Sequence, residues 1–419
     1  MEPPATSPPR RSSPRKLVWL AKAVTGLVAV GFALVAALLL VMWVEHRTAI
    51  TLPAPTGPFS VGRTTYTWTN ESATDEFAAS PASKRQVLVW IWYPAARSQR
   101  AVPADYLPAP WREALGQRLG VFLRSFLKRD PALVHAHSVT GAMVSPERPT
   151  YPVVLLRAGG SALTIDFTTL AEDLASHGFI VVGFDAPHRS FVTVLADGTV
   201  VARSPGANVE NAGGNLADPV IGKLLAMWTS DTRFVVDQLQ RLNDGPSAEF
   251  AGRMDFARLG MFGHSFGGAT ALEFCHQDAR CKAALDMDGI PFGSVVSDGL
   301  ATPCMFLLSD HSREMAGPEG RQVLAEIQSI YDRLPDGRWF AVILRSNHFS
   351  FSDQILLNSQ AAFGLLRLLG IGGLNGRRGL AISAACVHAF FNVYLNGAPA
   401  ASLTSLAGKY PEVRVQGRQ

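Results

Sequence analysis

The stretch LGMFGHSFGGATALEFCH, residues 259–276, decides the fold of this chain. It consists of a short apolar run, the pattern Gly-x-Ser-x-Gly at 263–267, and a helical pattern that ends at His276. A strand that turns sharply into a helix holds its serine in a strained conformation, and glycines two residues away on either side avoid collisions. The stretch therefore predicts that Ser265 is a nucleophile exposed at the carboxyl end of a sheet.

Apolar runs and helical patterns alternate on both sides of this stretch. The expected strands cover 152–156, 179–184, 259–262, 283–287, 304–308 and 340–344, and the expected helices cover 167–176, 228–242, 267–276, 360–369 and 380–396. Continuous apolar runs are typical of strands buried on both faces. We therefore expect an α/β fold, with a mostly parallel sheet covered by helices on both faces.

The segments between these elements give weaker signals. Arg63–Thr69 and Val87–Tyr93 are rich in aromatic and β-branched residues and predict antiparallel strands that open the domain. Phe191–Ala202 predicts a hairpin above the sheet, because Asp197-Gly198 lies at its middle. Residues 95–150 show scattered helical patterning and are not assigned to elements.

A serine nucleophile needs a base within hydrogen-bond reach. Of the ten histidines, His348 and His388 follow the later strands, and the chain order serine, acid, histidine is typical of the α/β-hydrolase fold. His348 comes just after the strand 340–344, whereas His388 lies inside a helical, apolar pattern. We expect His348 to be the base, and we interpret His264, beside the serine, as a packing or orienting residue.

Three aspartates are candidates for the acid that orients this histidine. Asp288 lies at the end of the strand 283–287, before a Gly-Ile-Pro turn, and is our first choice. Asp310 closes the next strand, where many proteins of this fold carry their acid. Asp286 shares the strand face of Asp288 by the period of two. Asp310 and Asp286 therefore remain alternatives.

Two backbone amides are expected to hold the developing oxyanion. One belongs to Phe266, directly after the serine, at the start of the helix. The other belongs to the loop Arg157–Ser161 after the first buried strand, where Gly160 is the best candidate because glycine lets the backbone approach a substrate closely.

The N-terminal region predicts a membrane anchor. Residues 23–44 are 22 uncharged, mostly apolar residues that as a helix span about 33 Å, enough to cross a bilayer. The segment before them carries a net charge of +4, from Arg10, Arg11, Arg15, Lys16 and Lys22 against Glu2. We expect a basic, disordered cytoplasmic arm at 1–22, the span at 23–44, a linker at 45–58 and an extracytoplasmic catalytic domain at 59–415. The alternative is a cleaved signal and a secreted domain.

Charge and cysteine content exclude several other classes. The formal net charge of +4 equals that of the N-terminal arm, so the rest is neutral and no nucleic-acid partner is expected. The four cysteines match no zinc motif, and we expect no metal and no cofactor. Cys275 and Cys281 are close enough to form a small disulfide loop, with two buried thiols as the alternative.

Several longer stretches resemble the plasma-type platelet-activating factor acetylhydrolases (lipoprotein-associated phospholipases) and their bacterial relatives. The resemblance runs from about residue 57 to 413. The stretches that carry it are Trp92-Tyr93-Pro94, Tyr151-Pro152-Val153-Val154, residues 174–181 (LASHGFIV), residues 263–270 (GHSFGGAT), Asp288-Gly289, His348-Phe349, Phe351-Ser352-Asp353 and Ala389-Phe390-Phe391. In register from Ser265, the acid of this family falls on Asp288 and its histidine on His348.

This resemblance implies calcium-independent hydrolysis of short or oxidised acyl chains at the sn-2 position of phospholipids. The chain departs from the family in the oxyanion loop, where Ala158-Gly159-Gly160-Ser161 replaces the usual His-Gly-x-Gly. It also has an anchor helix that the mammalian members lack, so lipoprotein binding is not implied. The alternatives are a broad esterase or polyesterase and, outside the enzymes, an inactive hydrolase scaffold that binds a partner at the membrane.

Overall fold

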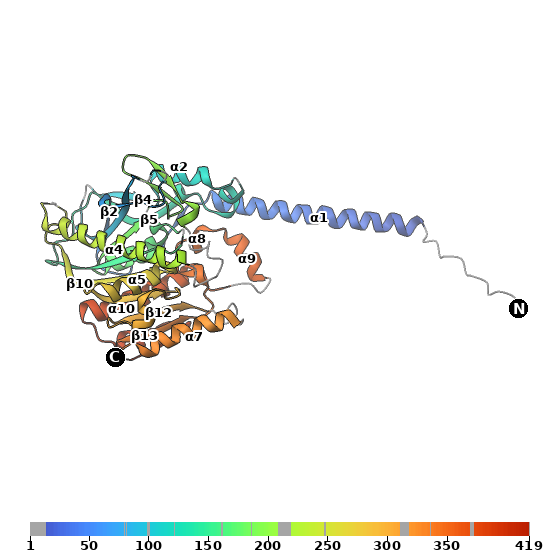
Figure 1. Ribbon diagram of the computed structural model, residues 1–419. Coiled ribbons are helices and arrows are strands. Elements are labelled where there is room, and N and C mark those ends of the chain that lie inside the picture. The colour runs from blue at the N-terminus through green and yellow to red at the C-terminus, as the bar shows by residue number, and fades with distance from the viewer. Residues whose placement is uncertain are drawn as a thin grey trace.

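The computed structural model describes residues 14–418 apart from 79, 81, 99–100, 121, 161, 186, 208–218, 247–248, 311–317, 336 and 369–372. A long helix, α1 (Pro14–His46), projects from a body built around a 12-stranded sheet (Figure 1). The start of this helix at Pro14 therefore lies far from the sheet, and the C-terminal strand forms one edge of the sheet.

The central strands of this sheet run parallel. In spatial order they are β7 (Ile180–Asp185), β6 (Tyr151–Arg157), β10 (Met254–His264), β11 (Cys281–Met287), β12 (Cys304–Ser309) and β13 (Arg338–Ile343). Antiparallel neighbours flank them, with β3 (Lys84–Ala95) and then β2 (Ser60–Thr74) beside β7 and β14 (Val413–Arg418) beside β13. Beyond β2 follow β5 (Val134–Thr140), β1 (Ile50–Thr51) and β4 (Val102–Asp105).

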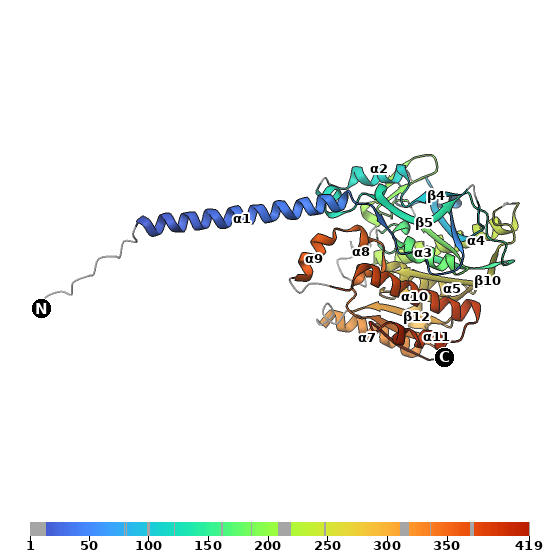
Figure 2. The same cartoon turned by 180° about the vertical axis from the view of Figure 1, so that it is seen from behind.

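Helices cover both faces of the sheet (Figure 1, and from behind in Figure 2). On one face, α3 (Thr168–Ser176) and α10 (Gly376–Asn396) share a core with Val154 and Leu156 of β6. On the other face, α4 (Pro219–Asp244), α5 (Phe266–Gln277) and α7 (Pro318–Arg333) share a second core with Val153 and Leu155. This alternation along one strand is the side-chain period of two that burial on both faces requires.

Shorter elements complete the body. They are α2 (Ala109–Arg118), η1 (Leu123–Leu127), β8 (Val192–Val194), β9 (Val200–Ala202), α6 (Ser294–Asp298), η7 (His348–Phe351), α8 (Gln354–Leu357), α9 (Gln360–Leu368), α11 (Ala401–Thr404) and α12 (Leu406–Lys409). A disulfide joins Cys275 near the end of α5 to Cys281 at the start of β11, so of the two alternatives that the sequence leaves open, the disulfide is the one found.

The predicted mostly parallel sheet with helices on both faces is confirmed, as is the hairpin within Phe191–Ala202. The two predicted opening strands are β2 and β3, and they pair antiparallel. The unassigned region 95–150 adds β4 and β5 to the edge of the sheet, and β14 adds the opposite edge. Edge strands bury only part of their surface, which is why the sequence carries a weak signal for them.

The N-terminal region differs from its prediction at both ends. The helix begins at Pro14, so residues 14–22 of the expected disordered arm are helical, and residues 1–13 lie outside the described part. In the expected linker 45–58, Ile50–Thr51 pairs with β5 and Leu52 is buried. Burial of the apolar Leu52 side chain in the core and the pairing of Ile50–Thr51 thus hold this segment against the body, so it is not a free linker.

The end of α1 is attached to the body by hydrogen bonds. One Glu45 carboxylate oxygen accepts hydrogen bonds from Ser359 Oγ (2.6 Å) and from the Ala361 amide (3.1 Å), at the N-terminus of α9. Arg129 donates to the Glu45 carbonyl (2.9 Å), and the Asp130 amide donates to the His46 carbonyl (3.1 Å). A carboxylate at a helix N-terminus is favourable both as a cap and toward the helix dipole.

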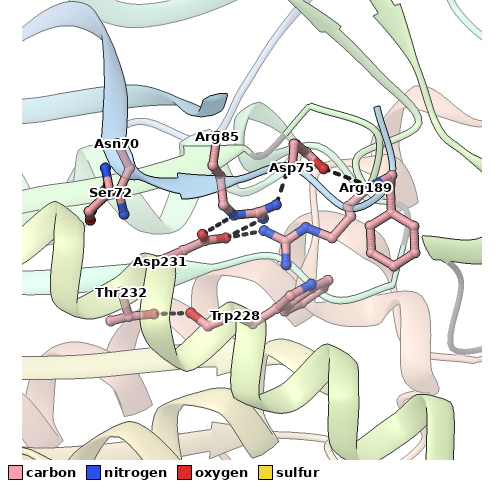
Figure 3. A network of polar contacts seen from close by, with 9 residues as sticks. Asn70, Ser72, Asp75, Arg85, Arg189, Trp228, Asp231 and Thr232 are labelled. Atoms are coloured by element: carbon pink, nitrogen blue, oxygen red, sulfur yellow. Dashed lines mark hydrogen bonds and ion pairs between the residues drawn. The ribbon is translucent and has the colours of Figure 1, made fainter. Parts of the chain in front are cut away.

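A buried ion-pair network ties α4 to β3 and to the loop after β7 (Figure 3). Asp231 of α4 pairs with Arg85, whose Nη2 lies 2.8 Å from Asp231 Oδ2, and with Arg189. Arg85 also pairs with Asp75 (3.3 Å). Burial alone would raise the pKa of Asp231, but the guanidiniums of Arg189 and Arg85 lower it to about 2. The carboxylate contributes stability above its unfolded pKa near 3.8 and loses it as the pH falls toward 2.

We predict that Asp231→Asn destabilises the protein by about 3–5 kcal/mol, because it takes the counter-charge from the buried Arg189 guanidinium and leaves Arg85 with Asp75 alone. Urea unfolding of the full-length protein in detergent, followed by tryptophan fluorescence, measures this loss. The matched control is Asp237→Asn on the same helix, whose half-exposed side chain pairs with Arg280 at 2.6 Å. That change should cost less than about 1 kcal/mol. Equal losses in the two variants would contradict a structural role of the network.

Candidate active site

Ser265 lies at the turn from β10 into α5, as the sequence predicts. Its φ of 56° is in the left-handed region, which is strained for a residue with a side chain. A Cβ at Gly263 would collide with the backbone of Gly267, and a Cβ at Gly267 would collide with the Arg157 carbonyl oxygen. The Ser265 amide donates to the Met287 carbonyl of β11 (2.9 Å). The turn is therefore held from both neighbouring strands.

Asp288 and His348 lie together beside this turn. His348 Nδ1 is 2.8 Å from Asp288 Oδ2, across 60 residues of sequence. Ser309 holds the same carboxylate through its amide to Oδ1 (2.7 Å) and its hydroxyl to Oδ2 (2.9 Å). The Asp288 carboxyl is buried, whereas the His348 side chain is about one-third exposed. The carboxylate can thus fix the imidazole tautomer and leave Nε2 open to accept a proton.

The two alternative acids lie elsewhere. Asp310 accepts a hydrogen bond from the Arg345 amide (2.7 Å), three residues before His348, and so holds the loop and not the ring. Asp286 accepts from the Gly289 amide (2.9 Å), and burial raises its pKa well above the usual value. A carboxyl whose charged form is disfavoured by burial and which is turned toward a glycine amide is poorly suited to orient an imidazolium.

The predicted oxyanion loop lies against the serine. A Cβ on Gly159 would come within 2.6 Å of Ser265 Cβ, so only glycine permits this approach. Gly160 follows with a φ of +47°, and Ser161 lies outside the described residues. Phe266 is the first residue of α5, and its buried ring packs edge-to-face on Trp228 at 4.9 Å between centroids. The amides of Gly160 and Phe266 thus belong to segments that flank Ser265.

Among the described residues, no hydrogen bond joins the Ser265 hydroxyl to His348. Catalytic hydrogen bonds are often long in the absence of substrate and shorten in the complex. His348 begins the short helical turn η7, which Asn347 caps by accepting from the Phe349 amide (3.0 Å). The ring of Phe349, which follows the histidine directly, is exposed and offers an apolar surface beside it.

Sequence reasoning does not find two supports of this site. Ser309 lies one residue before the candidate Asp310, but a serine at a strand end has no distinctive pattern. Arg157 is predicted only as part of the oxyanion loop, yet its guanidinium lies 4.0 Å from the centre of the Trp228 ring, behind Phe266. Over the described residues, no group of three or more His, Cys, Asp or Glu side chains forms a metal site.

Comparisons with known proteins agree with this geometry. Residues 236–396, which include Ser265, Asp288 and His348, match the family model described as platelet-activating factor acetylhydrolase, isoform II. The probable 1-alkyl-2-acetylglycerophosphocholine esterase of Arthroderma benhamiae is 25% identical over 391 residues, covering 86% of this chain and 92% of the relative. The platelet-activating factor acetylhydrolase of Cavia porcellus is 23% identical over 342 residues, covering 76% of this chain and 73% of the relative.

A solved structure gives the same fold over its whole length. The ferulic acid esterase of Streptomyces cinnamoneus superposes with a TM-score of 0.71 at 27% identity, covering 88% of this chain and all of the esterase. The expected α/β-hydrolase fold is therefore confirmed. Together, these relatives show that the chain is a carboxylic ester hydrolase that resembles the platelet-activating factor acetylhydrolase family.

Proposed function

We propose that this protein is a serine esterase that removes short or truncated sn-2 acyl groups from phospholipids, with Ser265, His348 and Asp288 as its catalytic triad. The observation that carries the proposal is the 2.8 Å contact between His348 and Asp288, next to a serine held in a strained turn. The substrate class is supported by relatives whose names specify 1-alkyl-2-acetylglycerophosphocholine or platelet-activating factor.

The reaction has two steps, acylation of Ser265 and hydrolysis of the acyl-enzyme. Ser265 Oγ attacks the ester carbonyl while His348 Nε2 takes the serine proton, and the oxyanion accepts hydrogen bonds from the Gly160 and Phe266 amides. The imidazolium, paired with Asp288, then gives that proton to the leaving lysophospholipid alkoxide, which leaves an acyl-enzyme. His348 then takes a proton from a water molecule that attacks the acyl-enzyme carbonyl, and the imidazolium returns this proton to Ser265 Oγ as the carboxylic acid leaves.

We predict that Ser265→Ala lowers turnover of a short-chain sn-2 phospholipid at least about 1000-fold, because no acyl-enzyme can form. The assay uses the full-length protein in detergent and measures the released acid. Ser297→Ala, an exposed serine of α6, is the control and should keep full activity. Unchanged turnover in Ser265→Ala would contradict the proposed nucleophile.

A second candidate function is a broad or aryl esterase, favoured by the ferulic acid esterase that superposes over its whole length. The same assay separates the two functions when p-nitrophenyl and feruloyl esters are compared with the phospholipid. Preference for the phospholipid in kcat/KM supports the first function. Ser265-dependent turnover of the simple esters alone supports the second.

The choice of acid gives a further prediction. Asp288→Asn should lower kcat by about 10⁴-fold, because an amide cannot hold the required imidazole tautomer or stabilise its charge. Asp310→Asn replaces the charged acceptor of the Arg345 amide by a neutral one without touching the imidazole, and we expect a loss of less than about tenfold. The measurement is kcat of both variants on p-nitrophenyl acetate. A larger loss in Asp310→Asn than in Asp288→Asn would reverse the assignment.

We further propose that α1 remains uncleaved as a single membrane span. The basic arm then lies in the cytoplasm, and the catalytic domain lies on the extracytoplasmic side of the membrane. Residues 18–46 have a mean hydropathy of 2.8 over their most apolar window and are almost entirely exposed, as a span requires. Among the described residues, the other helix that is both long and apolar enough to cross a membrane is α10, which is mostly buried and is a core helix.

We predict that the full-length protein with a C-terminal tag stays in membranes after alkaline carbonate extraction. In intact spheroplasts, added protease should digest the tag but not a second tag placed at the N-terminus. A carbonate-soluble product shortened by about 45 residues would instead indicate a cleaved signal. Protection of the C-terminal tag would contradict the proposed orientation.

A further inference from the structure

His264, the residue before the serine, occupies a position between the two candidate catalytic segments. It is the last residue of β10, and only 6% of its surface is exposed. Its ring lies among Phe167 (5.5 Å between centroids), Phe351 (6.0 Å) and the ring of His348 (4.4 Å). An imidazole enclosed in this way has little rotational freedom, and it touches the same segment, His348–Phe351, that carries the candidate base.

The ring makes a directional contact with that segment. His264 Nε2 lies 2.7 Å from the carbonyl oxygen of His348. A carbonyl oxygen only accepts, so Nε2 must carry the proton and donate it. The proton position of His264 therefore follows from its partner.

The electrostatic environment keeps His264 neutral. Burial lowers its pKa, the neighbouring His348 lowers it further, and Asp288 opposes them, which leaves it at about 3. His348 and Asp288 are the titratable groups that act on the His264 ring. A neutral ring does not compete with His348 for the proton of the serine or for the Asp288 carboxylate, so His264 has the properties of a fixed donor and not of a second base.

We propose that His264 is a positioning residue for the ester hydrolysis proposed above: its Nε2–H fixes the backbone of His348 relative to the turn that carries Ser265. The inference rests on that proposed function, because it acts through the His348 base. His264 does not contact the reacting atoms itself.

The hydrogen bond from His264 differs from the other contacts of the His348 segment. Asn347 caps the turn from within, and Asp310 holds the Arg345 amide from the end of β12. Asp288 holds the ring at Nδ1. The His264 contact is different in kind, because its donor is adjacent in sequence to the nucleophile. Any movement of the serine turn is thereby transmitted to the base, and a displacement near 1 Å can cost about 100-fold in rate.

The test compares amide side chains that differ in reach. The Gln amide nitrogen can occupy the place of His264 Nε2, whereas the Asn nitrogen is one bond shorter and cannot reach the carbonyl. We expect His264→Asn to lower kcat on p-nitrophenyl acetate by about 10- to 100-fold with KM changed less than about twofold. His264→Gln should recover most of that loss. His276→Asn, at a partly exposed histidine of α5, is the matched control and should keep full activity.

A double-mutant comparison shows whether His264 acts through the base. In a His348→Ala background the donor has nothing left to position, so adding His264→Asn should change the residual rate less than about twofold. Folding of each variant is checked by thermal unfolding, and His264→Gln serves as the comparison if the Asn variant is unstable, because a purely packing role would leave Gln as impaired as Asn.

Two results would overturn the proposal: no recovery in His264→Gln relative to His264→Asn, or multiplicative losses when His264→Asn is combined with His348→Ala. A separate result would contradict the proposed function on which this inference rests. If His348→Ala alone keeps full turnover, the proposed triad is wrong, and this outcome is separate from the behaviour of the His264 variants in the wild-type background.

Discussion

The passage of β10 into α5 over one residue constrains the rest of the site. It brings the backbone of Gly263 against Gly267, and the loop after β6 against both. A Cβ on Gly268 would collide with Asp286, so the same lack of side chains gives this buried carboxyl its place beside the helix. Asp286 then accepts from the Gly289 amide and stabilises the turn at Asp288, where φ is also positive. The close packing of the serine turn thus holds Asp286 against the helix, while Asp288 contacts His348.

A second set of contacts joins the segment that carries the candidate base to the end of α1. His348 begins η7, α8 follows directly, and α9 comes next. Lys128, whose carbonyl lies 2.8 Å from His46 Nδ1, places its ammonium 2.5 Å from Gln354 Oε1 of α8. Glu45 holds the start of α9. The end of the long N-terminal helix and the segment with the base therefore share one hydrogen-bonded region.

The elements whose residues are buried on both faces could be predicted from the sequence, because short continuous apolar runs bounded by turn residues are typical of central strands. The serine turn and the place of the candidate base could be predicted for a related reason: the glycines and the position after a strand follow from local sterics and chain order. Asp288 could be ranked first as the candidate acid, but Asp286, Asp288 and Asp310 all lie at strand ends, and only the three-dimensional path of the chain separates them. The edge strands β4, β5 and β14 depend on partners far away in sequence, and the donor role of His264 depends on a carbonyl 84 residues later.

The attachment of α1 changes what its helix can do for the enzyme. A flexible linker of fourteen residues would let a tethered domain rotate freely near the membrane. Here Leu52 is buried, Ile50 pairs with Val134 of β5, and Arg129 donates to the Glu45 carbonyl, so the helix end and the body have one relative orientation. Because the apolar part of α1 is exposed along its length, the orientation of this helix in a bilayer would also set the orientation of the carboxyl end of the sheet. With α1 in a bilayer and a lipid ester as substrate, as proposed above, this rigid attachment would limit the directions from which the ester can approach Ser265, before any contact with the substrate is made.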